Sequence, residues 1–141
     1  MSATTTSPGA RFATRVFRIA AIYGVIVLLP QYFMEGKIGR DTPPPITHPE
    51  YFYGFVGVAL AWQLAFLLIA RDPIRFRPLM PIAVLEKATF GVATIVLHVT
   101  GRLGLQMLGA GLVDLVLGTL FVLSYLRTAD ATRGDTPPHG R

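Results

Sequence analysis

The sequence predicts an all-α membrane protein, an antiparallel bundle of four transmembrane helices with disordered tails. Hydrophobic residues make up 52% of the 141-residue chain and charged residues only 15%, against about 25% charged in typical soluble domains. The apolar residues also gather into stretches of about 20 residues, which at about 1.5 Å per helical residue match a hydrocarbon core of about 30 Å. These predicted spans are Val16–Met34, Tyr51–Ala70, Ile82–Thr100 and Leu105–Leu126.

The first span follows a basic segment and ends in a stretch that contains a proline. Arg11, Arg15 and Arg18 precede the apolar run Ile19–Leu29, as in a secretory signal, but no small-x-small cleavage pattern follows it. We therefore predict a retained first helix. Pro30 is expected to kink this helix and to open a crevice at that end of the bundle.

Prolines and glycines mark the connections between the spans. The run Pro43–Pro45 lies between the first and second spans and requires an extended connection. Pro81 suits the first turn of the third helix, where its missing N–H costs nothing. Only a short segment around Gly101–Gly104 separates the third and fourth spans. These two helices are therefore predicted to be antiparallel neighbours.

Basic residues are distributed unequally between the two sides of the predicted bundle. Of the 13 lysines and arginines, all but three fall on the side that holds both chain ends, which predicts cytoplasmic termini. The net charge of +5 follows from this topology, so no nucleic-acid partner is predicted. Residues 1–12 and 128–141 are rich in small and polar residues, and we expect disordered cytoplasmic tails on either side of a membrane domain of residues 13–127.

Small residues on the fourth and second spans predict close helix packing. Glycines recur at heptad spacing along the fourth span, and small residues recur at every fourth position of the second. Small side chains let helix backbones approach closely in lipid. The predicted packing residues are Gly104, Gly111, Gly118, Gly57, Ala61 and Ala65.

Asp114 is the residue that most strongly indicates a functional or structural site. A charged aspartate at the centre of a membrane helix costs about 2.5 to 3.5 kcal/mol on insertion scales. We expect no lysine or arginine at its depth, so the carboxyl should be protonated and donate a hydrogen bond. The bond either fixes the bundle or belongs to a functional site.

The other polar residues of the spans are expected to join Asp114 or to lie at the membrane interface. Lys87, Gly91, Thr94 and His98 share one face of the third span, and Lys87 is expected to snorkel to the cytoplasmic interface. Counting inward from the predicted span ends places several polar groups near the midplane. The candidate residues for a polar core or ligand site are Asp114, Gln63, Thr94, Tyr23, Glu86 and His98.

No recognisable catalytic or metal-binding pattern occurs in the chain. Cysteine is absent, which excludes thiolate ligands and thiol nucleophiles. There is no nucleophile elbow, phosphate-binding loop or dinucleotide fingerprint, and the histidines lack metal-ligand spacing. We therefore predict no catalytic residue, no metal and no cofactor, although enzymatic activity stays open.

Three short runs resemble a group of small bacterial membrane proteins with four helices. They are His48–Phe55, Ala70–Pro78 and the pair Glu86–Lys87. In size and topology the chain also loosely resembles DoxX-like proteins. This resemblance implies a bacterial cytoplasmic membrane protein, and it transfers no functional residues.

Three functions remain open from the sequence. The first is an accessory subunit or a binder of a small apolar ligand or lipid, with the bilayer and a membrane protein or second copy of the chain as partners. The second is a lipid-modifying, isomerase-type enzyme whose acids face a cavity. The third is a small proton-coupled transporter in which Asp114 exchanges a proton. A wide cavity that reaches Asp114 would favour a ligand or enzyme site over a purely structural role.

Overall fold

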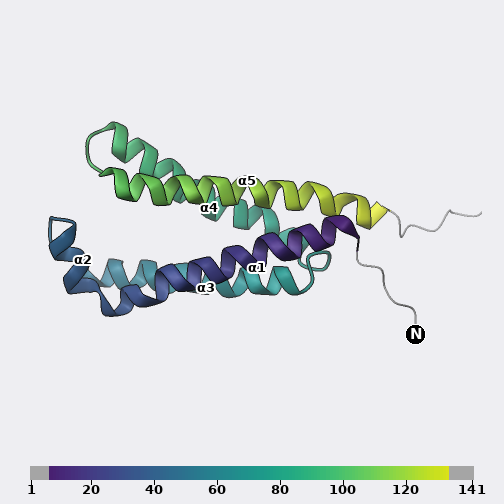
Figure 1. Cartoon of the computed structure of the whole chain (residues 1–141), viewed down its shortest axis with the longest axis horizontal. Helices are drawn as coiled ribbons and strands as arrows, with labels where there is room; N and C mark the ends of the chain where they lie inside the picture. The colour runs from purple at the N-terminus through teal and green to yellow at the C-terminus, as the bar shows by residue number, and fades with distance from the viewer. Residues whose placement is uncertain (1–6, 134–141) are drawn as a thin grey trace, which may run out of the picture.

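In the computed structural model, which describes residues 7–133, the chain folds into an all-α membrane bundle (Figure 1). Its elements in chain order are α1 (Pro8–Leu28), η1 (Leu29–Phe33), α2 (Glu35–Asp41), α3 (Pro49–Arg71), η2 (Arg77–Leu79), α4 (Met80–Val99) and α5 (Leu105–Arg133). Four segments are long and apolar enough to cross a bilayer: Pro8–Phe33, Pro49–Arg71, Arg77–Val99 and Leu105–Ala129.

Large apolar side chains on all four long helices point away from the bundle. Ile19, Leu64, Leu85 and Val116, one from each helix, are between 60% and 66% exposed. Such an apolar surface is unfavourable in water and suited to lipid chains, because only hydrocarbon solvates it without cost. The chain is an integral membrane protein with four spanning helices.

Both ends of the helical region differ from the prediction. The Ser7 hydroxyl caps α1 by accepting a hydrogen bond from Ala10 N at 3.2 Å, and Pro8 occupies the first turn. The first helix therefore begins before residue 13, and α5 continues past residue 127 to Arg133. The remaining parts of the predicted tails lie outside the described residues.

The connections follow the prolines, with one unexpected element. Pro81 lies in the first turn of α4 and Pro49 in the first turn of α3. The stretch before Pro43–Pro45, for which the sequence predicted no element, forms the short helix α2. At the α4–α5 turn, Gly101 adopts a positive φ of 73° and Arg102 N donates to Leu97 O at 2.8 Å. This glycine-ended motif stops α4 and reverses the chain.

The long helices form two hairpins that meet at one end and separate at the other. α1 pairs with α3, α4 pairs with α5, and α1 packs against α5, whereas α3 and α4 hardly touch. The hairpins converge where α1 begins and α5 ends, here named the terminal end (Figure 1). They diverge toward α2 and the α4–α5 turn, here named the α2 end.

Aromatic rings from three helices close the terminal end. Phe17, Phe66 and Phe121 are fully buried, and the rings of Phe17 and Phe121 stack with centroids 4.1 Å apart. The Phe66 ring lies 5.0 Å from that of Phe121. Alanines on α1, including Ala13 and Ala20, let the neighbouring helices approach this cluster. The half of the bundle near α2 has no comparable aromatic core among the described residues.

Candidate functional site

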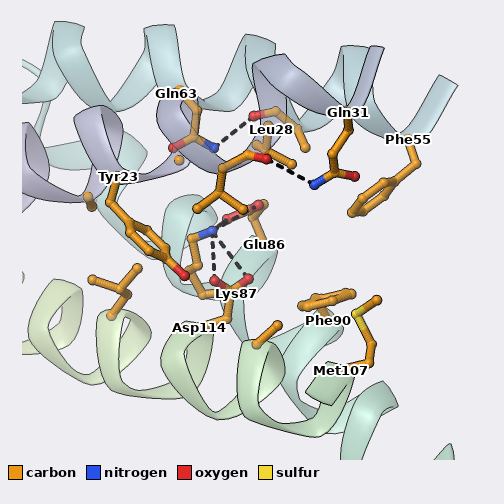
Figure 2. Close-up of a pocket in the computed structure, with 16 residues that line it drawn as sticks. Tyr23, Leu28, Gln31, Phe55, Gln63, Glu86, Lys87, Phe90, Met107 and Asp114 are labelled. Atoms are coloured by element: carbon orange, nitrogen blue, oxygen red, sulfur yellow. Dashed lines mark hydrogen bonds and ion pairs between the residues drawn. The ribbon is translucent and has the colours of Figure 1, made fainter. Parts of the chain in front are cut away.

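A cavity of about 130 Å³ lies between the two hairpins and is lined by all four long helices (Figure 2). We call it the central cavity. It extends from the aromatic core toward the α2 end, and most of its walls are apolar. Its lining residues are Ala20, Tyr23, Gly24, Val27, Leu28, Gln31, Phe55, Ala59, Gln63, Glu86, Lys87, Phe90, Met107, Ala110, Asp114 and Leu117.

The polar centre of the cavity is a cluster of one lysine and two acids. Lys87 Nζ lies 3.2 Å from both Asp114 carboxylate oxygens and 3.4 Å from Glu86 Oε1. The side chains are 8% exposed for Lys87, 16% for Asp114 and 19% for Glu86. Lys87 Nζ also lies 5.4 Å from the centroid of the Phe66 ring, whose face attracts a cation. Figure 2 shows the three charged groups together on one side of the cavity. We name them the charged triad.

Glycine contacts between α4 and α5 bring the triad together. A Cβ added at Gly118 would lie 3.3 Å from Lys87 Cβ, and one added at Gly91 would lie 2.5 Å from the Leu115 side chain. At Gly111 an added Cβ would lie only 1.7 Å from Thr94 Oγ1. The two backbones are thus as close as glycine allows. This close approach carries Lys87 across to Asp114.

Gln63 forms the opposite wall of the cavity, and one of its polar atoms has no hydrogen-bond partner. The residue is 1% exposed, and its Nε2 donates to Ala59 O at 2.8 Å. Its Oε1 is buried and accepts no hydrogen bond within the described structure. Gly24 on α1 makes room for this amide, because a Cβ there would lie 2.1 Å from Gln63 Oε1. A buried acceptor without a donor costs roughly 1–3 kcal/mol.

The end of the cavity nearest α2 is framed by a helix break and by aromatic side chains. α1 tightens into η1 at Leu29–Phe33, which contains Pro30, and Gln31 Nε2 donates to the carbonyl of Val27 at 3.2 Å. The rings of Phe55 on α3 and Phe90 on α4 stack with centroids 6.0 Å apart. They bridge the two helices that otherwise hardly touch. The crevice expected near Pro30 therefore forms the α2 end of this cavity.

The charged triad is not electrically balanced when every member is ionised. One ammonium faces two carboxylates, so the fully ionised triad carries a charge of −1. Glu86 is the less well paired acid: its Oε2 lies 3.3 Å from Lys87 Nζ yet lacks hydrogen-bond geometry. An uncompensated charge away from water is costly, since the ion loses its hydration and gains no equal partner.

Four of the six sequence-predicted site residues lie around the central cavity. They are Asp114, Gln63, Tyr23 and Glu86, and Tyr23 points toward Asp114 in Figure 2. Thr94 and His98 do not line it. The Thr94 hydroxyl donates to Gly91 O at 2.8 Å and packs on Gly111.

His98 has a role in the turn between α4 and α5. Its Nδ1 lies 2.8 Å from Leu103 O, and because a carbonyl only accepts, Nδ1 is the donor. The histidine was expected either to join the polar core or to be a hydrogen-bonded residue near the end of the bundle that holds the α4–α5 turn. It does not line the cavity and lies at that turn, where it holds the loop.

The expected environment of Asp114 was wrong in one essential respect. No basic residue was expected at its depth, and Lys87 was expected to snorkel to the interface. Lys87 is instead buried near the middle of the span Arg77–Val99 and contacts Asp114 directly. Asp114 therefore has an ammonium partner. The expectation was a protonated carboxyl that donates a hydrogen bond to Gln63, Thr94 or Tyr23.

The predicted packing residues divide into buried and open positions. Gly111 and Gly118 are buried against α4, whereas Gly104 has open space where a side chain would be. The second series was expected along Gly57, Ala61 and Ala65. Gly57 is half-buried with a Cβ position 3.0 Å from the Tyr32 hydroxyl, but Ala61 is exposed. α3 packs through Val56, Ala59, Gln63, Phe66 and Ile69 instead.

Several cavity residues were missed in the sequence. Lys87 appeared in the polar pattern of the third span but was assigned to the interface. Phe55, Phe90 and Met107 were not assigned to the site from the sequence. Within residues 7–133, no group of three or more histidines, aspartates or glutamates is placed to hold a metal ion.

The fold and cavity define the class of protein: a small four-helix integral membrane protein with a charged intramembrane cavity. Comparison with protein-family models, with curated proteins and with solved structures found no match to the chain. Functional inference therefore rests on the geometry of the cavity.

Proposed function

We propose that this protein binds a small, mostly apolar ligand with one polar group in the central cavity. The observation that carries the proposal is the enclosure of a charged triad by apolar and aromatic walls from all four long helices. Ligand sites are typically apolar hollows with a few convergent polar groups that fix orientation. The cavity volume of about 130 Å³ is close to the roughly 150 Å³ of an apolar cavity that binds benzene.

The cavity argues against a purely structural role for the acids. A structural pair needs only one lysine and one acid, yet Glu86 adds a second carboxylate next to Lys87. An unneeded buried charge is expensive, and intramembrane ionisable groups commonly mark ligand or proton pathways. The extra acid is therefore best explained by a partner that visits the cavity.

An isomerase-type enzyme acting on lipids is a second candidate. Such a site needs acids that face a cavity, and Glu86 and Asp114 both line it. His98, the other titratable candidate residue that could serve such a site, is held at the α4–α5 turn. Ligand binding is thus the better supported of the two functions.

The orientation in the membrane belongs to the same proposal. The excess of lysine and arginine on the side of both chain ends favours cytoplasmic termini in a bacterial cytoplasmic membrane. In that orientation the α2 end, and with it the wider end of the bundle, faces the outside.

A matched pair of cavity variants tests the proposal. Ala110 lines the cavity on α5, whereas Ala93 on α4 is exposed and lies outside it. Purification in mild detergent followed by mass spectrometry should find a small molecule bound to the wild type and to Ala93→Phe. Ala110→Phe fills the cavity and should lose it. Equal retention of every copurifying molecule by both variants would place binding elsewhere and overturn the proposal.

A further inference from the structure

We propose that Glu86 carries a proton while the central cavity is empty and releases it when a cationic amine group of a ligand enters beside it. This inference rests on the proposed ligand-binding function and names its ligand class: a small apolar or aromatic amine. It follows from the charge count of the triad. With Glu86 protonated the triad is neutral, and with Glu86 ionised it has room for one more positive charge.

The contacts identify Glu86 as the acid that exchanges the proton. Both oxygens of Asp114 accept hydrogen bonds from Lys87 Nζ at 3.2 Å. Glu86 contacts the same ammonium only at 3.3 and 3.4 Å, and its Oε2 has no hydrogen-bond donor. Lys87 is therefore paired first with Asp114, because its ammonium makes two hydrogen bonds to that carboxylate and one to Glu86.

The groups that face Glu86 from the other helices do not neutralise it. Besides Lys87 on α4, the titratable residues lining the cavity are Asp114 on α5 and Tyr23 on α1. α3 contributes Gln63, whose free atom is an acceptor. Among the buried atoms of the described lining, the two without a hydrogen-bond partner, Gln63 Oε1 and Glu86 Oε2, are oxygens. An ammonium, with three N–H donors and a positive charge, supplies what is missing.

The walls of the cavity also suit a cation attached to an apolar body. The rings of Phe55 and Phe90 stack at the α3–α4 side, and the centroid of the Phe66 ring lies 5.4 Å from Lys87 Nζ. Aromatic faces attract ammonium groups through their quadrupole. A carboxylate ligand would instead bring a second negative charge beside Asp114 with only Lys87 to balance both, so binding of an anion is disfavoured.

The exchange is balanced in atoms and charge. The neutral Glu86 carboxyl gives its proton to water, and the resulting carboxylate pairs with the entering ammonium, R–NH₃⁺. One positive charge enters and one leaves. No covalent bond other than the carboxyl O–H is broken, and nothing is oxidised or reduced.

Calorimetry with three ring-sized probes tests the inference on the full-length protein in detergent micelles. The probes are benzylamine, benzyl alcohol and benzoate, which share one ring and differ in charge. Titrations at pH 7 in two buffers of different ionisation enthalpy count the protons released. We expect benzylamine to bind with release of about one proton. Its affinity should therefore rise about tenfold per pH unit over the pH range in which Glu86 is protonated in the empty cavity. Benzyl alcohol should bind more weakly and release none, and benzoate should not bind.

Two variants complete the test. Ala110→Phe should abolish the heat of binding in the cavity for every probe that binds there. The heat that remains in this variant comes from partition of the probe into micelles. Glu86→Gln makes the triad neutral without a proton, so benzylamine should bind about tenfold more weakly or worse, with no proton release. The proton count of the wild type stands independently of how well this variant folds.

The outcomes distinguish the inference from the function on which it rests. Equal binding of amine and alcohol without proton release, blocked by Ala110→Phe, would overturn the inference and keep the binding function. Preferential binding of benzoate would overturn it as well. If Ala110→Phe removes no binding heat for any of the three probes, the cavity is not a site for ring-sized ligands. That result would count against both proposals.

Discussion

The side-chain amide of Gln63 on α3 occupies the space that a side chain at Gly24 on α1 would need. A Cβ at Gly24 would lie 2.1 Å from Gln63 Oε1 and 2.3 Å from its Cδ. The amide is fully buried and bonded to Ala59 O, so it cannot move aside without breaking that bond. This contact joins the first hairpin at the level of the cavity.

We predict that Gly24→Ala destabilises the bundle by about 1–3 kcal/mol, because it overpacks this contact. Gly54→Ala on α3 is the matched control, since its Cβ would have open space. The control should be neutral or slightly stabilising. In a Gln63→Ala background the clash disappears, so Gly24→Ala should then cost little. Unfolding measured in bicelles gives all four values, and an unchanged cost in the Gln63→Ala background would refute the contact.

A second glycine pair is expected to control the α4–α5 hairpin. Gly111→Ala places a Cβ against Thr94 Oγ1 and should force the two helices apart, with a loss of stability of about 1–3 kcal/mol. Gly109→Ala on the same helix has open space around its Cβ and should be tolerated. Thermal unfolding in detergent compares the two variants directly. Similar melting temperatures for both would argue that the backbones are not in close contact at Gly111.

Removal of the ammonium from the triad should be strongly destabilising. Lys87→Met leaves the Asp114 carboxylate buried without its counter-charge, and breaking a buried pair costs about 3–5 kcal/mol. Adding Asp114→Leu removes that charge, so the double variant should recover part of the loss. Folding free energies of the two single variants and the double variant give the coupling. Strictly additive losses would mean that Lys87 and Asp114 do not stabilise one another.

The aromatic pair between α3 and α4 is expected to govern ligand exchange. Phe90→Ala removes the ring that stacks on Phe55 and widens the cavity on this side. The dissociation rate of benzylamine, measured by NMR line shape, should rise about two- to tenfold, since one well-packed aromatic contact stabilises by about 0.5–1.5 kcal/mol beyond its buried area. Val92→Ala, at an exposed position outside the cavity, is the control. Unaltered exchange in Phe90→Ala would show that the ligand leaves by another way.

Reporter fusions test the proposed orientation. Fusions to both ends of the chain should report the cytoplasm, and a fusion inserted at Pro44, between α2 and α3, should report the outside. Any arrangement in which the two ends report opposite sides would be incompatible with four spanning helices. A consistent inversion of all three signals would keep the fold and reverse the orientation.

The spans, their order and their turns could be predicted because lipid imposes length and composition. The inward faces of the helices could not be predicted with the same success. A membrane helix is apolar on the side that meets lipid as well as on the side that meets its neighbours, so the amphipathic period that marks a buried face in soluble proteins is weak. Ala61 and Ala59 look alike in the sequence, yet the first is exposed and the second is buried.

The pairing of Lys87 with Asp114 was missed although the sequence held the necessary register. The α4–α5 turn is short, so residues equally distant from it lie opposite each other in an antiparallel pair. Counting back from Thr100 and forward from Leu105 sets Thr94 against Gly111 and Lys87 against Gly118, as the structure has them. Asp114 is about one turn from Gly118, within reach of a lysine side chain. The expectation that lysines snorkel concealed this register.

The sparse contact between α3 and α4 bears on how a ligand would reach the charged triad. Few contacts join these helices on the cavity side, chiefly the Phe55–Phe90 pair. An amphiphile already dissolved among the acyl chains could therefore enter sideways and never cross bulk water. The concentration that sets occupancy would then be the mole fraction of ligand in the lipid. Two amines with equal fit to the cavity would differ in apparent affinity by the ratio of their lipid–water partition coefficients. In that case the bilayer itself selects which molecules the protein encounters.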